Sequence, residues 1–280
     1  MNRNCRYSLI LVMGLWFVGM GSTSALDFGE LVDLGNKLKK IVSDVPVEEE
    51  VRIGGNLISG LLGAAPLVED PDLQQYVNDV GYWVASRSSR SDLPWTFGVI
   101  DSDGINAFAA PGGYVVITLG LYNLLQNEAQ LAGVLAHEVA HVVRRHHLIA
   151  LQKSMRREFL TDLTVLAADD GKKGRKLENL VNAGVQLYAT GLDREDELDA
   201  DLRGVVLAAR AGYDPFALLD VLTTIDSINP AAEELTVMLN THPPFADRLN
   251  RLAERMDGRL DRFASGRTNP ERFRRVALNP

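Results

Sequence analysis

Residues 131–143 place two histidines and one glutamate inside an otherwise apolar stretch. The apolar residues surround the three polar ones on the helical period, which predicts a buried helix. His137 and His141 are four residues apart, so they share one helix face, about one turn apart, where both imidazoles can bind one zinc ion. Glu138 is rotated about 100° from His137 and can reach a water on that metal. The stretch therefore predicts the metal centre of a hydrolase.

A third ligand has to come from elsewhere, because a catalytic zinc site has three protein ligands and one open position. His147 follows His141 by six residues, but an unbroken helix would carry it about 15 Å along the axis from His137. Arg144 stands where a glycine would allow such a helix to end and turn back. We therefore expect His146 and His147 to be exposed or to support the ligands rather than to bind the metal.

A more suitable ligand lies in the acidic run of residues 194–201, which opens a helix. Acidic side chains are favourable at a helix N-terminus, and this accounts for Glu195 and Asp196. It does not account for Glu197 and Asp201, which are four residues apart on a face that apolar residues continue. We predict that Glu197 is the third ligand and that Asp201 accepts a hydrogen bond from a ligand histidine.

The N-terminal stretch has the features of a secretion signal. Arg3 and Arg6 precede an apolar run over residues 7–20, and small residues then end at Ala25. The run has about 14 apolar residues, short of the roughly 20 that a membrane-spanning helix needs. We expect residues 1–25 to be cleaved and the mature protein to be periplasmic, without stable membrane insertion.

Composition excludes several classes of protein. The single cysteine, Cys5, lies within the expected signal and ahead of its apolar run, which argues against lipid attachment at the cleavage point. The mature chain would then have no disulfide, no thiol nucleophile and no cysteine-ligated zinc. Cleavage removes two basic and no acidic residues, so the net charge changes from −8 to −10. Such an acidic chain is a poor candidate for nucleic-acid binding.

The fold is expected to be α+β and mostly helical. Three short β-rich segments are bounded by turn residues, and nearly everything from residue 128 onward has helical periodicity. A small three-stranded sheet packed on a helical bundle would occupy residues 26–262, followed by a polar C-terminal arm over 263–280. The expected strands are 95–100, 106–109 and 113–118; helices are expected within 29–65, with a break near Pro46, and from Pro71 onward with Asp70 as its cap.

Two further sites are hypotheses. The strand after the Pro-Gly-Gly turn is either an edge strand that pairs with substrate through Gly113, Tyr114, Val115 and Val116, or an ordinary core strand. His242 lies in a proline-rich loop. It could bind the open position of the zinc and hold an enzyme latent, assist the transition state as a catalytic residue, or simply lie at the surface or cap a turn.

Five motifs occur in an order that resembles a known family: residues 106–113, the helix with His137 and His141, Arg194 to Asp201, residues 211–215, and residues 241–244 followed by Arg248. The chain resembles gluzincin metallopeptidases related to the CAAX prenyl endopeptidase, most closely their periplasmic BepA- and LoiP-like branch. The resemblance covers roughly residues 70–255.

The resemblance implies a zincin-type catalytic domain with one Zn²⁺ per chain, Glu197 as third ligand and Asp201 as its supporting residue. It implies an endopeptidase for polypeptides, often misfolded or stalled envelope proteins, with envelope or outer-membrane assembly proteins as partners. No oligomeric state is implied. No internal repeat of 30–45 residues is found, so we expect no appended repeat domain of the kind that some of these relatives have. The alternative is a chaperone-like or scaffold module in the envelope that binds zinc and cleaves little.

Overall fold

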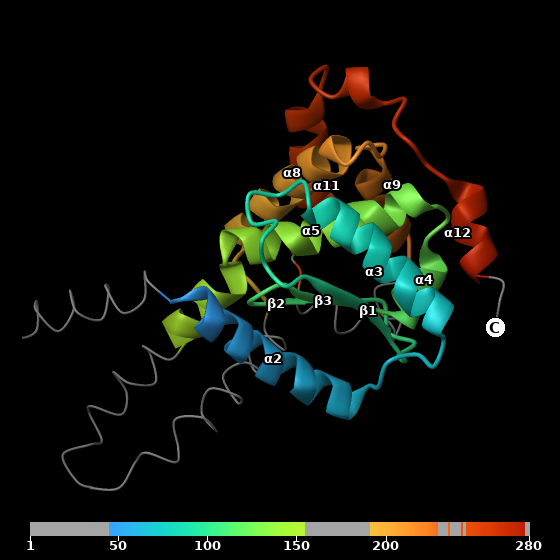
Figure 1. Ribbon diagram of the computed structural model, residues 1–280. Helices are drawn as coiled ribbons and strands as arrows, with labels where there is room; N and C mark the ends of the chain where they lie inside the picture. Colours follow the sequence, from blue (N-terminus) through green and yellow to red (C-terminus); the bar gives the residue numbers. More distant parts are fainter. Residues whose placement is uncertain (1–44, 155–190, 229–234, 236–241, 243–244, 278–280) are drawn as a thin grey trace, which may run out of the picture. The chain divides into compact units, whose positions relative to one another are not determined.

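A computed structural model describes residues 45–154, 191–228, 235, 242 and 245–277, so the expected signal over 1–25 lies outside the described residues. Helices dominate, and three strands form one sheet (Figure 1). The expected fold class is therefore confirmed. The elements are α2 (Val47–Ala64), α3 (Pro71–Ala85), β1 (Thr96–Ile100), β2 (Ala107–Ala110), β3 (Tyr114–Thr118), α4 (Leu119–Leu124), α5 (Glu128–Arg144), α8 (Arg194–Arg210), α9 (Ala217–Asp226), α11 (Phe245–Met256), η3 (Asp261–Phe263) and α12 (Pro270–Ala277).

The sheet has the strand order β1-β3-β2. The first pairing is parallel, with Thr96 opposite Tyr114, and the second is antiparallel, with Ala107 opposite Ile117. All three strands lie where the sequence predicts them. Because β3 is paired on both sides, the edge-strand hypothesis for Gly113, Tyr114, Val115 and Val116 is wrong, and the alternative of a core strand is correct.

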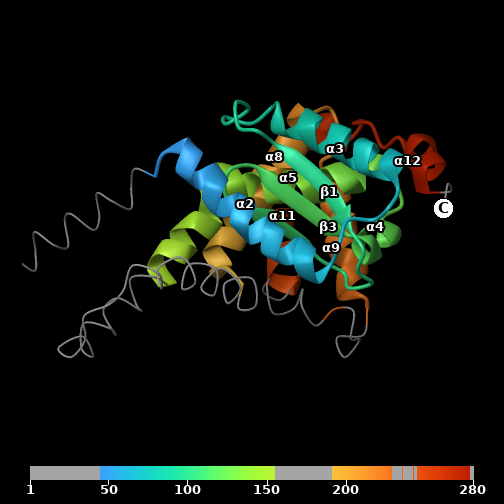
Figure 2. The same cartoon turned by 60° about the horizontal axis from the view of Figure 1, so that its bottom comes forward.

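Both faces of the sheet are covered, with α2 on one side and α3 and α5 on the other (Figures 1 and 2). The side chains of β3 alternate accordingly. Val115 and Ile117 pack into the larger core with α3 and α5, whereas Val116 packs with Ile53 and Leu57 of α2. Period-two burial of this kind follows from the pleat of a strand. The sheet is thus a central layer that supports α5 on one face.

The two helices that carry the predicted ligands begin and end as the sequence indicates. Asn127 caps α5 by accepting a hydrogen bond from the backbone N–H of Gln130 at 3.0 Å. After α8, Gly212 adopts a positive φ of 85°, which glycine tolerates. Asp70 likewise caps α3, as predicted, by accepting from Leu73 N–H at 3.0 Å. The α5 and α8 helices pack directly against each other.

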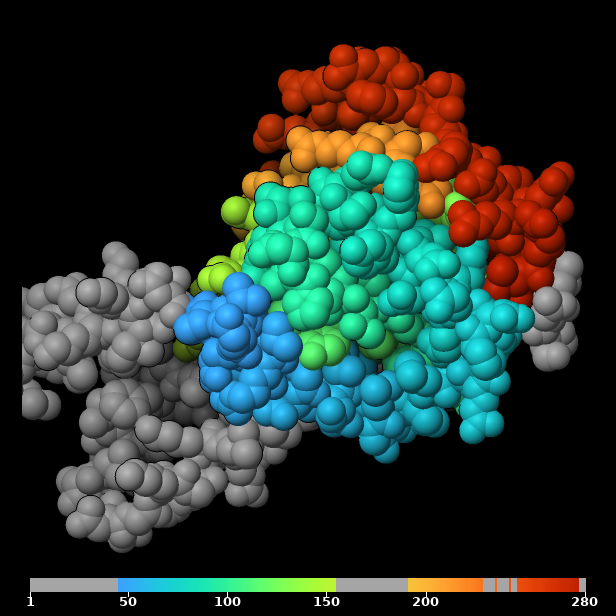
Figure 3. All heavy atoms as spheres, in the orientation of Figure 1, coloured from blue at the N-terminus to red at the C-terminus, as the bar shows by residue number. Residues whose placement is uncertain are grey.

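The polar C-terminal arm expected over residues 263–280 contains a helix that packs on the rest of the domain. Helix α12 packs on α3 and α5, and Figure 3 shows the C-terminal segment lying against α3. Phe273 is buried against Tyr76 and Tyr122, with ring centroids 6.4 and 5.0 Å away. Arg272 contacts the fully buried Glu128 at 3.3 Å. Apolar burial and one ion pair hold this segment, although its sequence is mostly polar.

None of the described helices has both the length and the apolar composition that crossing a membrane requires.

Candidate metal centre

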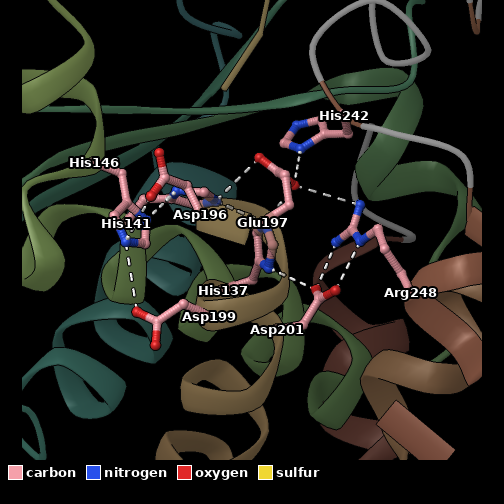
Figure 4. Close-up of polar contacts among 9 residues, drawn as sticks. All are labelled: His137, His141, His146, Asp196, Glu197, Asp199, Asp201, His242 and Arg248. Atoms are coloured by element: carbon pink, nitrogen blue, oxygen red, sulfur yellow. Dashed lines mark hydrogen bonds and ion pairs between the residues drawn. The ribbon is translucent and has the colours of Figure 1, made fainter. Parts of the chain in front are cut away.

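The α5 and α8 helices bring three potential metal ligands together. His137 and His141 present their Nε2 atoms 3.0 Å apart from successive turns of α5. Glu197, in the first turn of α8, approaches them with its carboxylate: Oε2 is 3.6 Å from His137 Nε2 and Oε1 is 3.5 Å from His141 Nε2. All three side chains are buried. Figure 4 shows them converging on one point between the two helices.

These separations fit a tetrahedral zinc site. Ligand atoms about 2.0–2.1 Å from a shared tetrahedral ion are about 3.3 Å from one another. The distance between the two Nε2 atoms is 3.0 Å, and the distances to the two Glu197 oxygens are 3.5 Å for Oε1 and 3.6 Å for Oε2, all near that value. One ligand atom from each of the three residues lies within 4.8 Å of the other two. In addition, Glu197 Oε1 is buried and makes no hydrogen bond to a described residue. A buried carboxylate oxygen in that situation is costly unless a cation compensates it. The donor set and its spacing therefore suit zinc.

The side of His137 that faces away from this cluster contacts Asp201, one turn further along α8. Asp201 Oδ1 is 2.9 Å from His137 Nδ1, although the N–H direction is bent away from the oxygen. Arg248 of α11 donates two hydrogen bonds to the same carboxylate, at 2.6 and 2.8 Å. Burial alone would raise the pKa of Asp201, but the Arg248 guanidinium outweighs it and lowers the pKa to about 2. The carboxylate is thus held ionised beside His137.

The pKa values of His137 and His141 are shifted in opposite directions. Burial would lower the pKa of His137, but its contacts with Asp201 and Glu197 raise the pKa to about 9. Burial lowers the pKa of His141 well below its ordinary value, because no carboxylate compensates it to the same extent. The pair therefore has one imidazole with a close carboxylate partner and one that favours the neutral form, the form that binds metals.

Helix α5 ends at a position where the sequence has no signal for a helix end. The sequence has no glycine to end the helix near Arg144, yet the helix stops there and Arg145 adopts a left-handed conformation with φ of 59°. The chain then turns into a second helical stretch over 146–154. As a result His146 is buried beside His141, with their Nδ1 atoms 3.1 Å apart, and the ring of His147 lies 5.3 Å from that of His141. His146 is thus a neighbour of a ligand and is not exposed.

His242 is brought into the centre from a distant part of the chain. Its Nδ1–H donates to Glu197 Oε2 at 2.7 Å, and its ring lies 5.8 Å from that of His137. The side chain is buried, so the alternative of a surface histidine is wrong. His242 is adjacent to the ligand cluster and contacts one of its members directly.

Glu138 points from α5 into a small pocket next to the cluster. Burial raises the pKa of Glu138 above its ordinary value. The pocket also contacts His137, His242 and Arg248, and the rest of its wall is apolar, with its largest share from α9. The apolar lining residues are Ala107, Leu121, Val134, Leu218, Val221, Leu222 and Ile225. A carboxylate, the ligand cluster and an apolar wall thus meet in one place.

Comparison with known proteins identifies the family. The family model for peptidase family M48 matches residues 71–256. This chain belongs to peptidase family M48. The expected resemblance to the gluzincin branch is thereby confirmed, and the cluster of His137, His141 and Glu197 fits the metal site of such a metallopeptidase.

Several known proteases are similar over much of the chain. The β-barrel assembly-enhancing protease of Escherichia coli (strain K12) is 31% identical over 255 residues, covering 89% of this chain and 51% of that protein. The putative β-barrel assembly-enhancing protease of Vibrio cholerae is 31% identical over 231 residues, 81% and 47% of the two chains. The mitochondrial metalloendopeptidase OMA1 of Schizosaccharomyces pombe is 31% identical over 179 residues, 64% and 52%. The chain spans about half the length of these relatives.

Three parts of this centre were not identified from the sequence. Arg248 belongs to one of the sequence motifs, but nothing near it in sequence indicates that it is buried on Asp201. The place of His146 depends on the left-handed Arg145, for which the sequence has no glycine signal. The apolar residues of α9 recur at helical spacing, so its apolar face could have been predicted. That this face lines a pocket with α5 could not, because α5 is far away in sequence.

Proposed function

We propose that this chain is a zinc-dependent endopeptidase that hydrolyses peptide bonds of polypeptides. The observation that carries the proposal is the convergence of His137, His141 and Glu197, whose ligand atoms lie within 4.8 Å of one another, with Glu138 in the pocket beside them. These three residues would bind one Zn²⁺. When bound, the ion would lower the pKa of a coordinated water towards 7 and polarise the carbonyl of the scissile peptide.

Glu138 is proposed as the general base and acid. It is not one of the converging ligands, yet it lies next to them and faces the pocket. Burial raises its pKa, which makes its carboxylate a better proton acceptor. Glu138 would take a proton from the attacking water and deliver it to the amine nitrogen that leaves. General acid–base catalysis of this kind contributes about 10²–10⁴-fold in rate.

Asp201 is proposed to hold His137 in the orientation that directs Nε2 to the metal. Arg248 would keep the Asp201 carboxylate ionised and in place, since it forms two hydrogen bonds with it. Partners of this kind typically change metal affinity by about 10–100-fold when they are removed.

His242 is proposed to regulate or assist the centre. Its hydrogen bond to Glu197 Oε2 competes for a ligand atom, which supports a role in latency. Its position on the pocket also supports contact with the substrate in the transition state. Replacement by alanine separates the two roles: cleavage rises if His242 holds the enzyme latent and falls if it assists the reaction.

Polypeptides are the proposed substrates, and misfolded or stalled envelope proteins are their proposed source, as the family resemblance implies. The periplasm is the proposed location, reached through a cleaved signal over residues 1–25. Proteins that assemble the outer membrane are proposed partners, since two of the relatives are named for enhancing β-barrel assembly.

One observation favours the alternative of a zinc-binding module with little proteolysis. His242 lies within 2.7 Å of Glu197 and could complete a closed, four-ligand site. Such a site would leave Glu138 and its pocket without a role, so we favour the peptidase.

Cleavage of casein by purified residues 26–280, with bound zinc quantified, tests the proposal against the variant Glu138→Gln. We expect the wild type to cleave and Glu138→Gln to bind zinc but lose about 10²–10⁴-fold of the activity. The control is Glu195→Gln, the same substitution on an exposed residue of α8, which should cleave normally. If wild type and His242→Ala both bind zinc and neither cleaves, the chain is a binding module.

A further inference from the structure

A histidine that binds a metal through Nε2 carries its proton on Nδ1, and that N–H needs an acceptor to fix the orientation of the ring. In the proposed peptidase, on which this inference rests, both His137 and His141 turn Nε2 towards the cluster. His137 has the Asp201 carboxylate at its Nδ1, 2.9 Å away. His141 is fully buried and has no carboxylate there among the described residues.

The Nδ1 of His141 is instead in contact with another histidine. His146 Nδ1 lies 3.1 Å away, at hydrogen-bonding distance, and the two rings are nearly perpendicular at 77°. His146 is itself buried. No other described side chain hydrogen-bonds to His141 Nδ1.

Only one proton can lie between two facing ring nitrogens. His141 has to supply it, because its Nε2 needs a free lone pair for the metal. His146 therefore accepts at Nδ1 and carries its own proton on Nε2. That second nitrogen is near two carboxylates of α8, with Asp199 at 3.5 Å and Asp196 at 3.7 Å. Both ends of the His146 ring thus have a suitable neighbour (Figure 4).

We propose that His146 is a positioning residue, which fixes the tautomer and orientation of His141 by linking its Nδ1–H to the carboxylates of Asp199 and Asp196. The arrangement parallels the contact between Asp201 and His137. The first turns of α8 would then provide one ligand and the supporting carboxylates of both histidines. The carboxylates of α8 on that side contact His146 and not His141. His141 is therefore connected to them through the imidazole of His146.

The end of α5 is what places His146 there. On an unbroken helix, residues five apart point about 140° away from each other, so His146 would face away from His141. The left-handed Arg145 reverses the chain in between. That conformation is unfavourable for a non-glycine residue. Both arginines at this turn have carboxylate partners: Arg145 lies 3.2 Å from the buried Glu50, and Arg144 donates to Asp199 at 2.8 Å.

The test compares zinc-loaded residues 26–280 with His146→Leu, His146→Asn and His147→Leu. Zinc dissociation constants are measured by competition with a chromophoric chelator, and kcat/KM by casein cleavage. We expect His146→Leu to weaken zinc binding by about 10–100-fold, the range for lost partners of ligand histidines. The asparagine side-chain oxygen can take the place of Nδ1, so His146→Asn should recover most of the affinity. His147→Leu removes the neighbouring imidazole and should leave zinc binding unchanged.

A spectroscopic readout makes the test independent of folding in the variants. Ring ¹⁵N shifts of the wild type should show the proton of His141 on Nδ1 and that of His146 on Nε2. The proposal is overturned if the protons are on the other nitrogens, if folded His146→Leu binds zinc like the wild type, or if His147→Leu weakens it equally. Absence of zinc binding by the wild type would instead overturn the proposed function, while the tautomers would still report on the contact.

Discussion

Gly204 of α8 lies directly on the backbone of His137 in α5. A Cβ atom at Gly204 would be 2.9 Å from both the Cα and the N of His137, closer than packed atoms approach. Only hydrogen fits between the two helices at this point. The contact sets the separation of α5 and α8 within a turn or two of Glu197 and Asp201, and so it controls the spacing of the proposed metal ligands.

Gly204→Ala should therefore force the helices apart. We expect a loss of about 1–3 kcal/mol in the free energy of unfolding, as for other overpacked sites, together with weaker zinc binding. The control is Gly60→Ala in α2, where a Cβ meets nothing within 4 Å. That variant should be more stable by about 0.5–1 kcal/mol, because alanine favours a helix interior. Urea unfolding measures both, and equal stability of Gly204→Ala and the wild type would refute the packing argument.

Acid should weaken the fold through Asp201. Its pKa is lowered from 3.8 to about 2, so its ionised form stabilises the folded state above pH 4, and this contribution is lost as the pH falls towards 2. The shift corresponds to about 2 kcal/mol. Urea unfolding in EDTA at pH 4 and pH 2 measures how much the free energy of unfolding falls between the two pH values. In Asp201→Asn this fall should be smaller than in the wild type by about the same amount. An identical pH dependence in wild type and variant would rule out the proposed charge contact with Arg248.

Zinc should raise the melting temperature through Glu197. Free zinc at 100 times its dissociation constant stabilises the folded state by about 2.7 kcal/mol. For a domain of this size that corresponds to about 5–10 °C, and EDTA should reverse it. Glu197→Gln keeps the shape of the side chain but not its charge, and should lose most of the increment. A full zinc-dependent shift in this variant would mean that Glu197 is not a ligand.

The C-terminal helix should contribute measurably to stability. Phe273→Ala in α12 removes a buried ring that contacts Tyr76 and Tyr122. Substitutions of this type cost about 3–5 kcal/mol. Arg274→Ala, next to it but exposed, should change stability by less than about 0.5 kcal/mol. If both variants unfold at the same urea concentration as the wild type, α12 is not part of the folded unit.

Sequence periodicity is sufficient to predict the local elements. The helix with His137 and His141 and the helix with Glu197 and Asp201 each have a polar set at spacing four within an apolar face, a pattern that indicates a buried polar site on a helix. The strand of residues 114–118 is also predictable. Its central place in the sheet is not, because strand order depends on pairing partners that periodicity does not identify.

Contacts between distant charged residues likewise cannot be read from the sequence. Glu50 is fully buried and pairs with Arg90, 40 residues away, at 2.8 Å, while Glu128 accepts from the hydroxyls of Tyr76 and Tyr213. Isolated acidic residues look like ordinary surface residues until the fold brings their partners to them. The same holds for Arg248, whose burial follows from Asp201 on another helix.

The ligands of the proposed zinc site come from two helices, with 55 residues between His141 and Glu197. During folding, His137 and His141 come onto one face only when α5 forms. The Glu197 carboxylate joins them only when α8 docks on α5 at Gly204. Zinc affinity is therefore a property of the completed tertiary structure. Under the proposed function, a chain in which α8 has not yet docked against α5 would lack the third ligand, so the catalytic centre would be assembled only at the last step of folding.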